Sequence, residues 1–95
     1  MKRNKIRYLV ECEGGSFNVT YKDKKNEIKQ IQKIKKRWKY FFRANRENYL
    51  YLSAQANSKN AEIKIKIKNN REILKTVTKK GDYCVATASA ELLFV

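Results

Sequence analysis

The residues most able to do chemistry in this sequence are basic, and they fall into two groups. In AEIKIKIKN, residues 61–69, lysines alternate with isoleucines, which would place the lysines on one face of a β-strand at intervals of about 7 Å. That interval is near the spacing of phosphates along an extended nucleic-acid strand. Further cations flank Trp38, whose ring would offer a stacking surface to a base or a sugar. The candidate basic binding face consists of Lys36, Arg37, Lys39, Lys64, Lys66 and Lys68.

Both groups also have an ordinary structural interpretation. Exposed lysines form solvated sheet faces, and lysine is a common residue for protecting an edge strand against aggregation. Trp38 is predicted to be the core anchor, because a small sandwich needs one large residue at its centre. With Lys+Arg 23 against Asp+Glu 9 and a net charge of +14, weak non-specific binding to polyanions is expected in either case. If the charge is only decoration, removing three lysines from residues 64–68 or three from elsewhere should weaken that binding equally.

Catalytic and metal-binding groups are scarce. The sequence has no histidine, and its nine acidic residues are spread singly apart from Glu11 and Glu13. A Cys/His metal centre and a histidine general base are therefore excluded, and we expect no enzyme activity and no cofactor. Cys12 and Cys84 lie near opposite ends of the chain and are a candidate disulfide if their strands meet. Two free, buried thiols are the alternative.

The elements that would carry these residues are predicted to be β-strands. Apolar and polar residues alternate in KIRYLVEC, SFNVTYK, AEIKIKIKN and REILKTVTK, while ENYLYLSAQA and DYCVATASA are rich in strand-forming residues. Turns are expected at Gly14-Gly15, at DKKN, at NREN (residues 45–48), at Asn69-Asn70 and at Lys80-Gly81-Asp82. Turn signals at intervals of about 8–12 residues indicate an all-β sandwich or barrel.

One stretch, IKQIQKIKKRWKYFFR at residues 28–43, fits two structures. Its isoleucines and aromatics have the spacing of a basic amphipathic helix, which would suit a membrane surface or an acidic partner. It also fits two lysine-rich strands with the aromatic side chains in the core. Strands are favoured because every other well-defined segment is extended.

The chain is short enough to form a single domain, residues 1–95, with residues 1–7 as a flexible basic arm. No apolar run approaches the roughly 18–20 residues that a transmembrane helix needs. The N-terminus does not fit a signal peptide, because its apolar segment is interrupted at Glu11. The protein is therefore expected to be either exported, with a signal or anchor already removed, or cytoplasmic.

The order of several motifs resembles the MmpS-like family of small envelope proteins. GGSFNVTY, the Trp-led RWKYFF, LYLSAQ, IKIKIKNNREILK and GDYCVATASAEL follow one another as the corresponding motifs do in that family. The resemblance covers roughly residues 8–93. It implies a single immunoglobulin-like antiparallel β-sandwich of about seven strands.

The resemblance also implies a function. The best-known members of the family are envelope proteins that partner lipid exporters, so we expect a non-enzymatic, exported or envelope-associated protein that binds another protein or an envelope component. This chain differs from those members because it lacks an N-terminal transmembrane anchor and a proline before the Trp, and because it is far more basic. The alternative is a basic nucleic-acid-binding module that uses surface lysines and aromatics.

Overall fold

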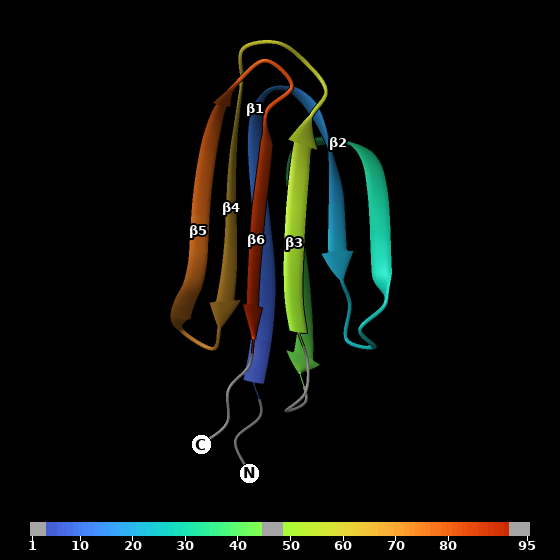
Figure 1. The fold of residues 1–95 in the computed structure, drawn as a ribbon, viewed down its shortest axis with the longest axis vertical. Helices are drawn as coiled ribbons and strands as arrows, with labels where there is room; N and C mark the ends of the chain where they lie inside the picture. The colour runs from blue at the N-terminus through green and yellow to red at the C-terminus, as the bar shows by residue number, and fades with distance from the viewer. Residues whose placement is uncertain (1–3, 45–48, 92–95) are drawn as a thin grey trace.

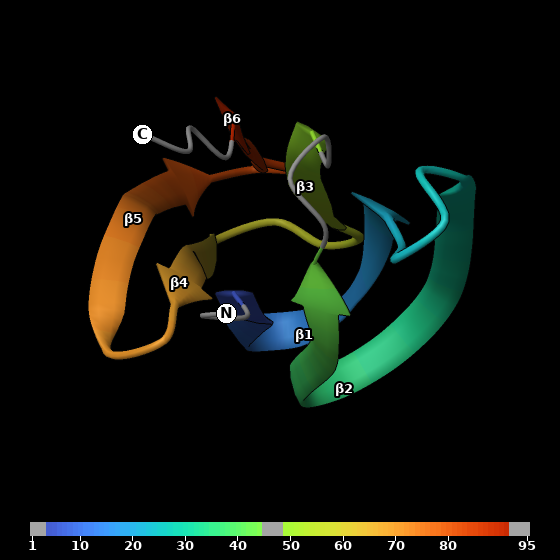
Figure 2. The ribbon, with the colours of Figure 1, turned by 90° about the horizontal axis from the view of Figure 1, so that it is seen from below.

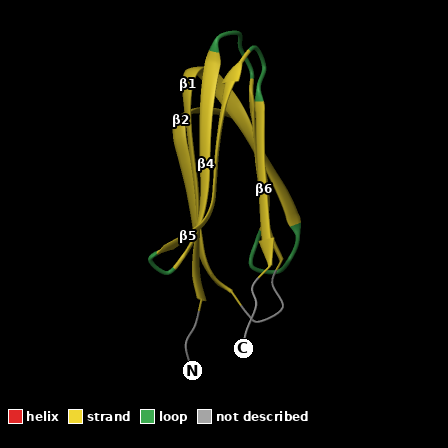
Figure 3. Ribbon diagram, turned by 60° about the vertical axis from the view of Figure 1, so that its left-hand side comes forward, coloured by secondary structure: helices red, strands yellow, loops and turns green. Residues whose placement is uncertain are grey.

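The computed structural model describes residues 4–44 and 49–91, and their regular structure is entirely β-strand (Figures 1 and 3). The strands are β1 (Asn4–Lys22), β2 (Ile28–Ala44), β3 (Tyr49–Ala56), β4 (Ala61–Asn69), β5 (Glu72–Gly81) and β6 (Val85–Glu91). They form one antiparallel sheet with the order β5-β4-β1-β3-β6, and β2 pairs with β1 outside this path. Seen from below, the sheet curls until it is nearly closed into a barrel (Figure 2).

The all-β prediction is thus confirmed, whereas the number of strands is six rather than about seven. The immunoglobulin-like sandwich is not confirmed, because the strands belong to a single curled sheet. The strands in residues 61–69 and 72–81 form the predicted hairpin, which turns at Asn70 with a φ of 57°.

β1 is one long strand because its bend does not end its pairing. Gly14 and Gly15 have φ of 101° and 145°, a region open to glycine and strained for other residues. Before the bend β1 pairs with β4, and after it residues 17–21 pair with residues 52–56 of β3. The prediction that Gly14-Gly15 separates two strands was therefore wrong, since partners on both sides of the bend keep the chain extended.

β2 resolves the ambiguity of residues 28–43 in favour of extended structure. It is a single strand of 17 residues that pairs with β1 from end to end, so the prediction of two separate strands was wrong. Irregularities replace the expected break, and Lys33 and Lys36 have φ of 58° and 70°. The preceding turn is held by Asp23, whose Oδ1 accepts N–H bonds from Lys25 (2.8 Å) and Glu27 (3.0 Å).

The core lies inside the curl of the sheet. Tyr8 and Phe17 are the largest fully buried side chains, and the isoleucines of β4 are fully buried beside them. The Tyr8 hydroxyl donates to the carbonyl of Lys22 at 2.9 Å, which joins the two ends of the bent β1. The side chains that are less than 2% exposed and largest in volume are Tyr8, Phe17, Ile6, Leu50, Leu52, Ile63, Ile65, Ile67, Val10 and Val19.

Trp38 packs at the margin of this core. Its ring is half-buried, lies 4.8 Å from the Tyr21 ring centroid, and stacks almost parallel to Tyr40 at 6.2 Å. Tyr8 is fully buried and contacts Tyr21 and Tyr40 in its turn, so Tyr8 occupies the central place that was predicted for Trp38.

At the N-terminus, residues 4–7 belong to β1 and do not form the predicted arm. Residues 1–3 and the turn predicted at residues 45–48 lie outside the described residues.

Candidate functional site

The outward-facing side chains of β1 connect two groups of cations that are far apart in the sequence. The even-numbered residues 6–12 of β1 are buried, so the odd-numbered residues point away from the core. In the first half of β1, β2 lies on one side and β4 on the other. The register across these strands gives three rows: Arg37–Glu11–Lys64, Lys39–Leu9–Lys66 and Phe41–Arg7–Lys68.

We call this surface the outer basic face. Opposed residues in neighbouring strands have Cβ atoms about 5 Å apart, and successive outward residues of one strand are about 7 Å apart. The cations are therefore arranged as a lattice rather than as a single row. The outer basic face comprises Lys5, Arg7, Arg37, Lys39, Arg43, Lys64, Lys66 and Lys68.

Carboxylates are concentrated at one end of the outer basic face. Glu11 lies between Arg37 and Lys64, and Glu13 and Glu62 form the next row, so three carboxylates surround Lys64. The ion pairs Lys29–Glu27 (3.3 Å) and Lys80–Glu62 (3.2 Å) involve none of these cations. The two rows Lys39–Leu9–Lys66 and Phe41–Arg7–Lys68 contain cations and no carboxylate, so this part of the outer basic face is able to hold an anion.

An aromatic ring lies within this field. Phe41 is 51% exposed, and the guanidinium carbon of Arg7 lies over its ring, 6.0 Å from the centroid. Both residues help to line a shallow hollow of about 650 Å³. Arg7, Leu9, Lys39, Tyr40 and Phe41 line this hollow.

The structure brings together five of the six predicted cations. Arg37 and Lys39 face outward from β2, level with Lys64 and Lys66 of β4. Lys36 does not join them, because it lies at an irregularity of β2 where the pairing with β1 is interrupted. Trp38 points to the opposite face of β2, so it is not a stacking ring beside these cations.

The sequence interpretation missed three cations of this surface and the Phe41 ring that lies among them. Lys5 and Arg7 alternate with buried residues at the start of β1, and that alternation was a usable signal. Phe41 and Arg43 follow the same alternation in β2 but stand in the run WKYFFR, where aromatic residues occur on both faces. Only the pairing with β1 shows which of these residues point outward.

The two cysteines are free thiols in this structure. Cys12 is buried, whereas Cys84 is half-buried and its Sγ lies 3.8 Å from the carbonyl oxygen of Ala61. Ile63, the partner of Cys12 in β4, is two residues from Ala61, so the two thiols occupy neighbouring regions of the core. Burial, followed by the nearby Cys84 and Glu13, raises the pKa of Cys12. The Cys12–Cys84 disulfide stays a prediction.

A second hollow, of about 610 Å³, lies at the bend of β1, beside Glu13 and Gly14. Glu13 and Glu62 face each other there across β1 and β4, and Lys80 pairs with Glu62. Across residues 4–44 and 49–91, no group of three or more His, Cys, Asp or Glu side chains is placed to hold a metal ion. The same ranges contain no helix with the length and apolar character required to cross a bilayer.

The sequence matches no family model, and no curated protein matches it.

Proposed function

We propose that this protein is a non-enzymatic binding protein that holds polyanions on the outer basic face. The observation that supports the proposal is the register of β1, which places Arg37 and Lys39 of β2 beside Lys64 and Lys66 of β4. Charge scattered over a surface would bind anions weakly everywhere. Cations held at fixed spacings on three paired strands instead give several simultaneous contacts to neighbouring phosphates or sulfates.

The lysine row of β4 has a measurable contribution under this proposal. For a single-stranded nucleic acid, the logarithm of the binding constant falls with the logarithm of salt concentration with a slope of about −0.7 per phosphate neutralised. If Lys64, Lys66 and Lys68 each contact one phosphate, replacing all three with glutamine should reduce the slope by about 2. Loss of these contacts should also weaken binding at low salt by tenfold or more relative to a control.

The matched control is the triple variant Lys24→Gln, Lys25→Gln and Lys29→Gln. These residues are exposed in the β1–β2 turn and at the start of β2, and their replacement removes the same formal charge. Fluorescence anisotropy with a labelled oligothymidylate, titrated at several salt concentrations, measures both triple variants. Equal losses of affinity in the two variants would mean that the charge is surface decoration, and the proposal would fail.

The order of motifs that resembles MmpS-like proteins supports a second proposal, an exported sandwich-type protein that binds another protein or an envelope component. A signal peptide or lipobox encoded directly before residue 1 would favour that function. Its absence, together with a selective loss of affinity in the β4 triple variant, would favour polyanion binding.

A further inference from the structure

Phe41 has an environment that its structural role does not explain. The ring is 51% exposed and contributes nothing to the buried core, in which Phe42 fills the neighbouring inward position. Its neighbours on the outer basic face are Lys39, Arg43 and Arg7. An apolar ring placed among cations, with one guanidinium over it, is typical of a surface that binds an anionic ligand with a flat apolar part.

The position of Phe41 relative to the lysine row defines that ligand further. Phe41, Arg7 and Lys68 lie on one row across β2, β1 and β4. Phe41 is therefore two strand spacings from the lysine row, roughly 10 Å. That distance is about the reach of a nucleotide from its phosphate across the sugar to its base. A nucleic-acid strand lying along β4 would extend its bases over β1 toward Phe41.

We infer that Phe41 is a stacking site for a base of a single-stranded nucleic acid whose phosphates lie along Lys64, Lys66 and Lys68. This inference rests on the proposed function and narrows its ligand. Duplex nucleic acid fits poorly, because paired bases are stacked on one another and do not offer a free face. A membrane surface also fits poorly, because the two exposed apolar side chains of this row, Phe41 and Ile73, are separated by Arg7 and Lys68 and form no continuous apolar patch for insertion. A single ring suffices for one base.

The test compares two ligands of equal length and charge, a labelled oligothymidylate and the same backbone without bases. The wild-type protein should bind the oligothymidylate more tightly than the abasic strand. The Phe41→Leu variant should bind the oligothymidylate about 5- to 100-fold more weakly, because a stacking contact is lost, and should bind the abasic strand as the wild type does. The Phe41→Trp variant should retain or increase the affinity for oligothymidylate, which also covers the case in which leucine impairs folding.

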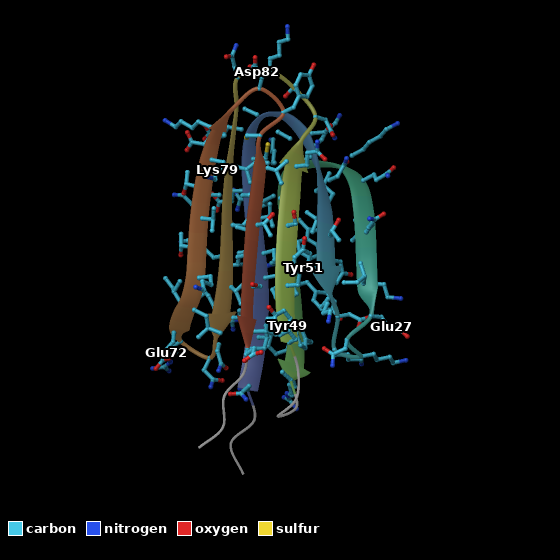
Figure 4. All side chains as sticks on the ribbon, viewed as in Figure 1. Glu27, Tyr49, Tyr51, Glu72, Lys79 and Asp82 are labelled. Carbon is cyan, nitrogen blue, oxygen red and sulfur yellow. The ribbon has the colours of Figure 1, made fainter. Side chains whose placement is uncertain are left out.

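Tyr83→Leu is the matched control. Tyr83 is 52% exposed and lies in the β5–β6 turn next to Asp82, at the opposite end of the molecule from Glu72 and the β4–β5 turn (Figure 4). The row that contains Phe41 and Lys68 lies near the β4–β5 turn, because Lys68 pairs with Ile73 of β5. Replacing Tyr83 removes an aromatic ring of equal exposure and should leave both affinities unchanged.

The outcomes separate this inference from the proposed function. If Phe41→Leu binds oligothymidylate as the wild type does, the stacking site is refuted, while wild-type binding to the abasic strand still supports the outer basic face. If the wild type binds neither ligand at low salt, both ideas fail. Vesicles containing phosphatidylserine provide the third comparison. Tighter binding to these vesicles than to oligothymidylate, abolished by Phe41→Leu, would identify a membrane site and overturn the inference.

Discussion

Replacing Gly14 with alanine should destabilise the protein more than the same replacement at Gly81. Both glycines have positive φ, 101° and 139°, so alanine is strained at either position. They differ in what a new methyl group would meet. At Gly14 the added Cβ would lie 2.9 Å from the carbonyl oxygen of Asn60 and 3.2 Å from the Cα of Ala61, whereas nothing lies within 4 Å of it at Gly81.

The magnitude follows from these two contributions. Backbone strain should cost roughly 1–2 kcal/mol at each glycine. The contact at Gly14 is with backbone, so the chain between β3 and β4 must shift, at a further cost of about 1–3 kcal/mol. That chain is bonded to β1 by the N–H of Asn57, which donates to the carbonyl of Ser16 at 3.0 Å. We expect Gly81→Ala to lower the free energy of unfolding by about 1–2 kcal/mol and Gly14→Ala to lower it by about 2–5 kcal/mol.

Denaturation by urea, followed through the fluorescence of Trp38, measures both variants. A domain of this size has a total stability of roughly 5–14 kcal/mol, so both variants should still fold in the absence of denaturant. The difference between the two variants is the informative quantity, because it removes the strain that they share. Losses that agree within about 0.5 kcal/mol would show that the bend does not depend on close approach of the β3–β4 connection.

Three further predictions concern Tyr8, Asp23 and the cysteine pair. Tyr8→Phe should destabilise by about 1–2 kcal/mol in the same urea assay, because the Lys22 carbonyl loses its buried donor, and an unchanged midpoint would contradict this. Burial opposes ionisation of Asp23, but N–H bonds from Glu27 and Lys25 and nearby lysines outweigh it, so the pKa of Asp23 is lowered. The stabilisation by ionised Asp23 is therefore fully present above 3.8, the pKa of this group in the unfolded chain, and is lost as the pH falls through its lower pKa in the folded protein. Over that pH range the Tm of Asp23→Ala should fall less than the Tm of the wild type. Oxidised dithiothreitol should form a disulfide between Cys12 and Cys84, seen by mass spectrometry as the loss of two hydrogens. The disulfide should raise the free energy of unfolding by up to roughly 4 kcal/mol, and Cys84→Ser should show neither change.

Local patterns were sufficient to predict the strands but not their continuity. The alternation of apolar and polar residues in 61–69 is a local pattern that can be read directly from the sequence, and the strand predicted from it was correct. Gly14-Gly15 looks like a strand end for the same local reason. The strand continues because β3 and β4 bond to β1 on either side of the bend, and those contacts join residues about 31 to 63 positions apart.

The candidate site shows the same limit. Lys64, Lys66 and Lys68 were identified correctly as one face, because a strand places alternate residues together. That this face continues through Arg7 to Phe41 depends on β1 lying between β2 and β4, which no local pattern specifies. The orientation of Phe41 was obscured further because Tyr40 and Phe42, its neighbours, are aromatic as well.

The central position of β1 also has a consequence for synthesis on the ribosome. The β1–β2 hairpin can form once Ala44 has emerged, but the other edge of β1 has no partner until β3 and β4 follow, through Asn69. At about 5–20 residues per second, translation of that interval takes roughly one to five seconds. During this time the nascent hairpin presents unpaired backbone groups beside Ile6 and Tyr8, which later become fully buried. The nascent protein is therefore most susceptible to chaperone capture or self-association when about half of the chain has been made.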